Sequence, residues 1–94
     1  MIMPDPIAVQ HNAVAHTYEA VVDGHRSVCD YELSDGKIIF THTFVPSELR
    51  GRGIAEQLVR TALADARKSG RKVVPACSYV ALFIQRHKEY ADLL

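Results

Sequence analysis

The feature that most constrains the fold is a change in the spacing of apolar residues near residue 50. Residues 37–45, KIIFTHTFV, are rich in β-branched and aromatic side chains, which is typical of a strand. From residue 53 to 69 the apolar residues recur at helical spacing, and Gly70 supplies a C-terminal stop. A short apolar run, residues 72–76, follows. This order predicts a β-α-β crossover, in which the two strands lie parallel.

The first half of the chain predicts an antiparallel meander. Turn signals at Asp23-Gly24 and at residues 34–36 separate strands expected at 16–22, 26–33 and 37–45. Residues 1–15 are expected to form a partly ordered leader, loose over residues 1–6, with a short edge strand at 7–10. A second helix is predicted over 79–87, and residues 90–94 are expected to cap the core. The whole chain, 1–94, is therefore expected to be one α/β domain, an α+β mixed sheet in the order β-β-β-α-β-α.

Charge is unevenly distributed along the chain. Residues 1–47 carry two basic and six acidic groups, whereas residues 48–94 carry nine basic and five acidic groups, and the total is zero. A zero total argues against general nucleic-acid binding, which rests on many phosphate contacts. The local excess of cations around the loop at residue 50 favours a small polyanion.

Other broad features exclude several classes of protein. Cys29 and Cys77 make no disulfide framework, and the five histidines show no metal-ligand spacing, so free thiols and no metal are expected. There is no apolar run of membrane-spanning length and no signal-peptide pattern, which favours the cytoplasm and no membrane partner. The oligomeric state is expected to be a monomer or a weak dimer.

The loop between the strand at 37–45 and the helix predicts an anion site. Arg50, Gly51, Arg52 and Gly53 combine flexible backbone, positive charge and a helix N-terminus, whose unpaired N–H groups favour a phosphate. The alternative interpretation is a plain structural turn. The loop lacks both the G-K-[ST] of a Walker A motif and a G-x-G-x-x-G fingerprint.

These residues also carry a resemblance to a known family. Arg50-Gly51-Arg52-Gly53-Ile54-Ala55 matches the [QR]-x-x-G-x-[GA] signature of the GNAT superfamily of acyl-CoA-dependent N-acetyltransferases. Together with the segments HTFVP (42–46), VVPAC (73–77) and RHKEY (86–90), the chain resembles small single-domain GNAT-like proteins over residues 18–94.

The resemblance implies a ligand, acetyl-CoA, and a set of contacts to it. The loop, with Ile54 and Ala55, would cradle the pyrophosphate of coenzyme A. The pantetheine arm would run between the strands at 37–45 and 72–76, against the backbone of Phe44 and Val45. Further candidates for cofactor contact are Cys77, Phe83 and Arg86.

The catalytic residues are less fully matched. GNAT enzymes often use a glutamate on the central strand as base and a tyrosine on the last helix as acid. Residues 37–45 hold no carboxylate, and Gln85 stands where that tyrosine would be. His42 could act as the base, or it could be packed in the sheet. Cys77, before the second helix, could be a nucleophile, or a small buried residue beside pantetheine; Tyr79 is a weaker candidate acid.

The resemblance therefore implies an acetyl-CoA-binding N-acetyltransferase-like protein that transfers an acetyl group to a small amine or a protein lysine. Because no strand is predicted after the second helix, the acceptor site is expected to be open. The alternatives are a coenzyme A-binding module with weak or no turnover, and an adaptor whose loop binds nothing.

Overall fold

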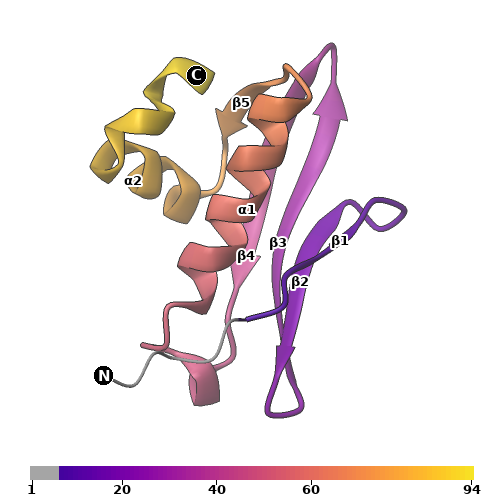
Figure 1. Ribbon diagram of the computed structural model, residues 1–94, viewed down its shortest axis with the longest axis vertical. Coiled ribbons are helices and arrows are strands. Elements are labelled where there is room, and N and C mark those ends of the chain that lie inside the picture. The colour runs from indigo at the N-terminus through magenta and orange to yellow at the C-terminus, as the bar shows by residue number, and fades with distance from the viewer. Residues whose placement is uncertain (1–6) are drawn as a thin grey trace.

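A computed structural model describes residues 7–94 and contains one five-stranded sheet with both α-helices on one face (Figure 1). The strands are β1 (Gln10–Asn12), β2 (Thr17–Val22), β3 (His25–Ser34), β4 (Lys37–Phe44) and β5 (Lys72–Pro75). The helices are α1 (Ile54–Lys68) and α2 (Ser78–Arg86), with short 3-10 helices η1 (Ser47–Leu49) and η2 (Lys88–Leu93). The strands lie in sequence order across the sheet.

Strands β1 to β4 form the predicted antiparallel meander, which two tight turns close. Asp23 and Gly24 have φ values of 51° and 76°, and Asp35 and Gly36 have 51° and 75°. Two successive positive φ angles match the right-handed twist of the flanking strands, and this requirement explains the Asp-Gly pairs. These turns set the register in which Val22 faces His25 and Ser34 faces Lys37.

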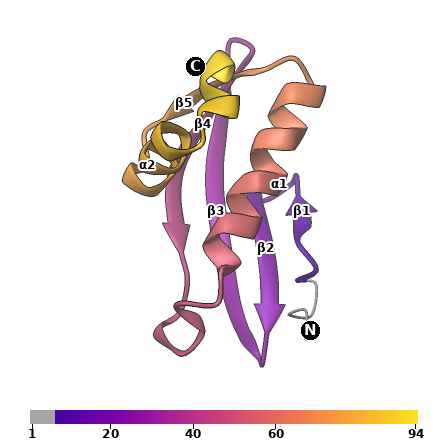
Figure 2. The same cartoon turned by 60° about the vertical axis from the view of Figure 1, so that its left-hand side comes forward.

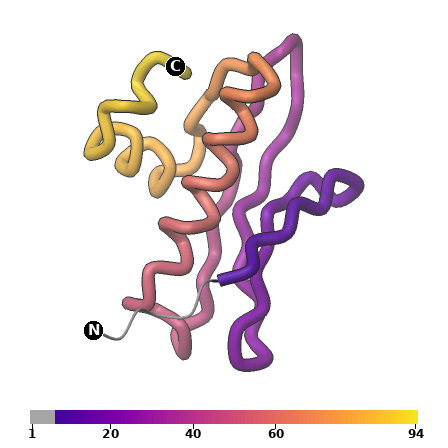
Figure 3. The backbone as a smooth tube through the Cα atoms, in the orientation of Figure 1, coloured from indigo at the N-terminus to yellow at the C-terminus, as the bar shows by residue number. Residues whose placement is uncertain are grey.

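The predicted β-α-β crossover is confirmed. β4 and β5 pair in parallel, from Lys37 opposite Lys72 to Phe40 opposite Pro75. Figure 3 follows the chain from the end of β4 through α1 and back to β5. The apolar face of α1 is buried against the sheet, through Ile54, Leu58, Val59, Ala62, Leu63 and Ala66.

Both α-helices share one hydrophobic core on the same side of the sheet (Figure 2). Val80, Phe83 and Ile84 of α2 join this core, and Leu93 of η2 is buried there too, as expected for a C-terminal segment that caps the core. Within residues 7–94 no helix covers the opposite face of the sheet, where Val21, Phe44 and Val74 are exposed.

The structure corrects the predicted edge strand. The ladder begins at Gln10 and ends at Asn12, with His11 opposite Tyr18, rather than spanning residues 7–10. Ile7 and Val9 pack against the core instead, because burial of their apolar side chains is favoured over an exposed strand edge. The leader expected at residues 1–6 lies outside the described residues. The two 3-10 helices were not predicted, and the other boundaries differ from the predicted ones by one residue.

None of the helices in residues 7–94 has the length and apolar character that crossing a membrane requires.

Candidate functional site

Among residues 7–94, the backbone donors at the start of α1 have no partner outside the helix. Gly51 and Gly53 have φ values of 82° and 76°, a region that side chains with a Cβ rarely adopt. Gly53 is the N-cap and supplies no side-chain hydrogen bond, and the first helical bond runs from the Gln57 amide to the Gly53 carbonyl. The N–H groups of the first turn are therefore available to an anion.

The two parallel strands separate beside this loop. Pairing between β4 and β5 stops at Phe40 and Pro75, and the Cys77 amide then donates a hydrogen bond of 2.7 Å to the Phe40 carbonyl. β4 continues to Phe44, and no described strand pairs with Thr41–Phe44 on the β5 side. Since Pro75 has no N–H, the pairing ends where a donor is missing. The result is a stretch of free strand edge next to the loop.

A groove joins the free strand edge to the loop. One cavity of about 290 Å³ is lined by Val45, Leu49, Arg50, Gly51, Gly53, Ile54, Ala55, Glu56 and Tyr79. An adjoining cavity of about 250 Å³ shares four of these residues and extends to Thr43 and Phe44. We call the two together the β4 groove. It is bounded by β4, the N-terminus of α1 and the first turn of α2.

Cys77 lies next to Thr43, the residue at one end of the β4 groove. Its Sγ is 3.4 Å from Thr43 Oγ1, and the same hydroxyl donates to Cys29 Sγ at 3.8 Å. Cys77 is 9% exposed and is the N-cap of α2, whereas Cys29 is fully buried. Burial raises the pKa of Cys29 to about 12, so this thiol stays protonated at neutral pH. A negative charge on the Cys77 sulfur would face the positive end of the α2 dipole.

Tyr79 lines both parts of the β4 groove and also a third cavity along α2. Burial, with the nearby Glu56 carboxylate as a smaller cause, raises the pKa of its phenol. The hydroxyl is therefore a neutral proton donor at physiological pH. Tyr79 was only a weaker candidate in the sequence analysis, because α-helical periodicity does not show that the first turn of α2 borders the groove.

The third cavity, of about 330 Å³, continues the site along α2. It is lined by Glu56, Tyr79, Leu82, Phe83, Arg86 and His87. The rings of Phe83 and His87 stack at 4.1 Å, and the Arg60 guanidinium lies 5.3 Å from the centre of the Phe83 ring. Arg86 is exposed at the rim. This arrangement presents flat apolar surface beside positive charge.

The two loop arginines have different surroundings. Arg50 lines both parts of the groove, and its Nε donates to the Val45 carbonyl at 3.3 Å. Arg52 does not line the groove, because its guanidinium makes a 2.8 Å ion pair with Asp23 in the β2–β3 turn.

His42 lies on the opposite face of the sheet from Cys77. Thr43 points toward Cys77, so its neighbour His42 points to the uncovered face, where its ring stacks with Phe44 at 6.4 Å. The register places His42 directly opposite Asp30 on β3. His42 and Cys77 are thus separated by the sheet and do not form a contacting pair.

Thr43 and Glu56 line the groove and were not among the residues predicted for the site. Strict alternation from the buried Ile38 and Phe40 would place Thr43 on the uncovered face of the sheet. The structure places it on the helix-covered face, because the register between β3 and β4 shifts at Asp30 and Tyr31, so that Asp30 faces His42 but Tyr31 faces Phe40. Thr41 is the extra residue in this bulge.

The fold and the groove define an α/β domain with a glycine-containing loop at a helix start beside separated parallel strands. The family model for the GCN5-related N-acetyl-transferase matches residues 17–93. Relatives called Protein NATD1 from Mus musculus and Homo sapiens are each 31% identical over 85 residues, which cover 87% of this chain and 77% and 75% of theirs. The solution NMR structure of a GCN5-like protein from Staphylococcus aureus has a TM-score of 0.74 at 20% identity, covering 96% of this chain and 89% of that one.

This chain therefore belongs to the GCN5-related N-acetyltransferase family. The mixed sheet with a parallel β4–β5 pair is the family's fold, as the similarity to the staphylococcal structure shows.

Proposed function

We propose that this protein binds acetyl-CoA in the β4 groove and transfers the acetyl group to an amine. The observation that carries the proposal is the continuity of the groove from the loop at Gly53 to Thr43, whose hydroxyl lies 3.4 Å from the Cys77 sulfur. Coenzyme A has three corresponding parts: a pyrophosphate, an amide-containing arm and a terminal thioester.

Each part of the cofactor has a matching surface. The pyrophosphate would accept hydrogen bonds from the amides at residues 53–56 and from Arg50. The pantetheine amides would pair with the free edge of β4 around Phe44 and Val45, in the manner of an added strand. The adenine and its phosphate would lie in the cavity beside Phe83 and Arg86, with stacking and charge as the attractive forces.

The acetyl thioester would then reach Cys77 and Thr43. In one route the Cys77 thiol gives its proton to solvent and its sulfur attacks the carbonyl carbon, the bond to the coenzyme A sulfur breaks, and the departing thiolate takes a proton from Tyr79, which solvent then reprotonates. An amine next attacks acetyl-Cys77, which releases the Cys77 thiolate and forms the amide; the amine's proton passes to a base. In the second route the amine attacks acetyl-CoA directly, and Cys77 only borders the thioester.

The acceptor would approach across the uncovered face of the sheet. His42 lies on this face, and it could take the amine's proton only where the amine enters the fork between β4 and β5 from this side, because the sheet separates His42 from Cys77. The acceptor is a small amine or a protein lysine. Asp30 and Glu32 of β3 would favour a cationic amine, since both residues are acidic.

Intact mass measurement after incubation with acetyl-CoA tests the chemistry. The acyl-cysteine route predicts an adduct of one acetyl group that is absent in Cys77→Ala and present in Cys29→Ala. Direct transfer predicts no adduct, together with acetylation of an amine substrate that survives Cys77→Ala. Acetyl-CoA binding without either result would favour the second candidate function, a coenzyme A-binding module; the lack of a carboxylate in β4 is the observation that favours that candidate.

A further inference from the structure

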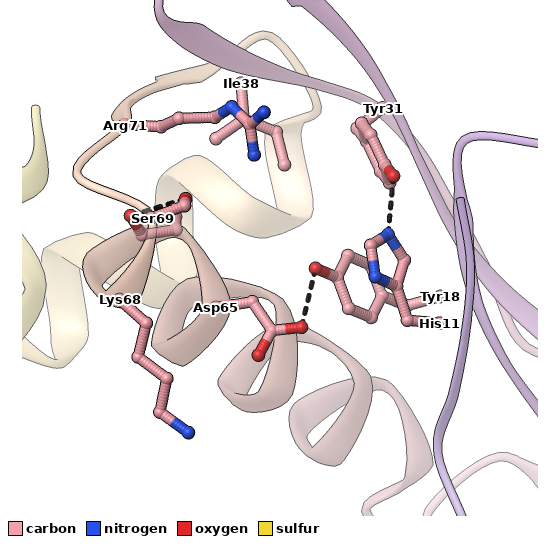
Figure 4. A pocket seen from close by; sticks show the side chains of 9 residues that line it. His11, Tyr18, Tyr31, Ile38, Asp65, Lys68, Ser69 and Arg71 are labelled. Carbon is pink, nitrogen blue, oxygen red and sulfur yellow. Dashed lines mark hydrogen bonds between the residues drawn. The ribbon is translucent and has the colours of Figure 1, made fainter. Parts of the chain in front are cut away.

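A separate cavity, which we call the distal cavity, lies at the far end of α1 from the β4 groove and shares no residue with it (Figure 4). Its volume is about 360 Å³, within the usual range for small-molecule sites. It opens between β1–β3 and the last turns of α1. The side chains that matter for recognition are His11, Tyr18, Tyr31, Asp65, Lys68 and Arg71.

One wall of this cavity is aromatic and held in place. The ring of His11 stacks on Tyr18 at 4.3 Å with an interplanar angle of 6°, and its Nε2 lies 2.6 Å from the Tyr31 hydroxyl. Tyr18 and Tyr31 are 2% and 5% exposed. Burial raises the pKa of both phenols, so the two tyrosines are neutral at physiological pH. The rings therefore offer a rigid apolar surface.

The other walls hold opposite charges that do not neutralise each other. Asp65 accepts a 2.9 Å hydrogen bond from the Tyr18 hydroxyl through Oδ2, which leaves Oδ1 available. The Arg71 backbone amide is fixed by a 3.0 Å bond to the Ala66 carbonyl, while its guanidinium has no ion pair or hydrogen bond with any described residue. No ion pair within 4.0 Å joins Asp65 to Arg71.

The separation of these charges distinguishes the cavity from the rest of the surface. Arg67, one turn earlier, makes a 2.6 Å ion pair with Asp92. Figure 4 shows the Arg71 guanidinium on one side of the cavity and the Asp65 carboxylate on another, with the tyrosines between them and the β-sheet. The Lys68 ammonium group points away from Arg71 in this view. A ligand that carries both charges would satisfy Asp65 and Arg71 together.

We propose that this cavity binds a small zwitterion of the α-amino-acid class with an apolar or aromatic side chain. The ligand carboxylate pairs with the Arg71 guanidinium in a bidentate contact, and its ammonium group donates to Asp65 Oδ1. The side chain packs against Tyr31 and Ile38. The site is separate from the acetyl-CoA groove, and its occupancy does not depend on acetyl transfer.

The test is an NMR titration of the ¹⁵N-labelled full chain with L-phenylalanine. Two analogues serve as ligand controls: 3-phenylpropanoate lacks the ammonium group, and 2-phenylethylamine lacks the carboxylate. We expect saturable shifts at the amides of His11, Tyr18, Tyr31 and Arg71, with each analogue bound about tenfold more weakly. Equal affinity for all three ligands would overturn the proposal. So would the absence of saturable shifts at ligand concentrations up to roughly 10 mM, which would mean binding weaker than small-molecule recognition requires.

Two variants test the charges themselves. Arg71→Gln and Asp65→Asn should each weaken L-phenylalanine binding about tenfold, because each removes one charge-assisted contact. Arg67→Gln is the matched control, since it changes an arginine in the last turn of α1 that does not line the cavity, and its affinity should equal that of the wild type. Equal affinity in all three variants would contradict the proposal. Acetyl-CoA binding should be unchanged in each, so failure here is distinguishable from failure of the proposed function.

Discussion

The Cys77 amide donates its hydrogen to the Phe40 carbonyl at 2.7 Å, at the point where β5 leaves β4. This bond holds a cysteine at the fork between two parallel strands and starts α2 there. Thr43, three residues further along β4, lies 3.4 Å from the same sulfur. The fork, the free edge of β4 and the thiol are thus parts of one local arrangement, and the groove reaches the thiol's neighbour Thr43.

Replacing Gly53 should affect ligand binding through the backbone alone. An added Cβ would meet nothing within 4 Å, but φ is +76°, so Gly53→Ala should cost about 1–2 kcal/mol. Acetyl-CoA affinity should also fall, because the first-turn amides would turn away from the pyrophosphate. Gly70→Ala, with φ of +70° at the other end of α1, is the control: urea unfolding should show a similar loss, and calorimetry should show unchanged affinity. Equal affinity in both variants would count against the loop as the phosphate site.

The two loop arginines should differ in their importance for the ligand. Arg50→Gln removes a cation that lines the groove and should weaken acetyl-CoA binding roughly tenfold, since hydrogen bonds to charged groups contribute about 1.5–3 kcal/mol. Arg52→Gln removes a cation already paired with Asp23 and should change the affinity less than about threefold, a surface ion pair being worth about 0–1 kcal/mol. Titration calorimetry at fixed salt checks both, and the reverse ranking would show that Arg52 leaves Asp23 when ligand binds.

Tyr79→Phe tests the proton donor. If Tyr79 protonates the leaving thiolate, kcat should fall about 10²-fold or more while the dissociation constant of acetyl-CoA stays nearly constant. Because burial raises the pKa of this phenol above its usual value, loss of its proton should not lower wild-type activity anywhere in the neutral range. Steady-state rates from pH 6 to 10, read beside the affinity, provide the measurement. An unchanged kcat in Tyr79→Phe would mean that water, and not Tyr79, protonates the leaving thiolate.

Cys29 should make the folded state sensitive to alkaline pH. Burial raises the pKa of its thiol from 9.0 to about 12, so between these values the unfolded chain loses this proton and the folded chain keeps it. The free energy of unfolding should therefore fall as pH rises through this window, by up to about 1.4 kcal/mol per pH unit. Urea unfolding in a reducing buffer should give a shallower pH slope for Cys29→Ala. An identical slope would mean that Cys29 ionises without unfolding.

Much of the fold follows from local sequence signals. The two Asp-Gly pairs require positive φ angles and so fix the meander, and the change from strand to helical spacing after residue 45 fixes the crossover. The prediction of an edge strand at residues 7–10 was wrong. Ile7 and Val9 have β-forming side chains, but these pack against the core and do not belong to a strand. The spacing of residues along the sequence does not show whether such side chains will join a strand or pack against the core.

The site was predicted in part, for a related reason. The loop residues are contiguous, so their shared position at the start of a helix is visible in the sequence. The relation between His42 and Cys77 depends on which face of β4 each side chain reaches, and the bulge at Thr41 shifts that alternation. Two further contacts join residues that are distant in sequence. Thr43 lies beside Cys77, and Arg52 forms an ion pair with Asp23 that holds it away from the groove.

The most direct measurement is an NMR titration of the labelled protein with acetyl-CoA, followed at backbone amides. The account predicts saturable shifts at residues 50–56 of the loop, at Thr43, Phe44 and Val45 of the β4 edge, and at Cys77 and Tyr79. The amide chemical shifts of His11 and Arg71, which line the distal cavity, should not change. Absence of saturable shifts along the β4 groove, or binding confined to another surface, would contradict the claim that the fork between β4 and β5 is a coenzyme A site.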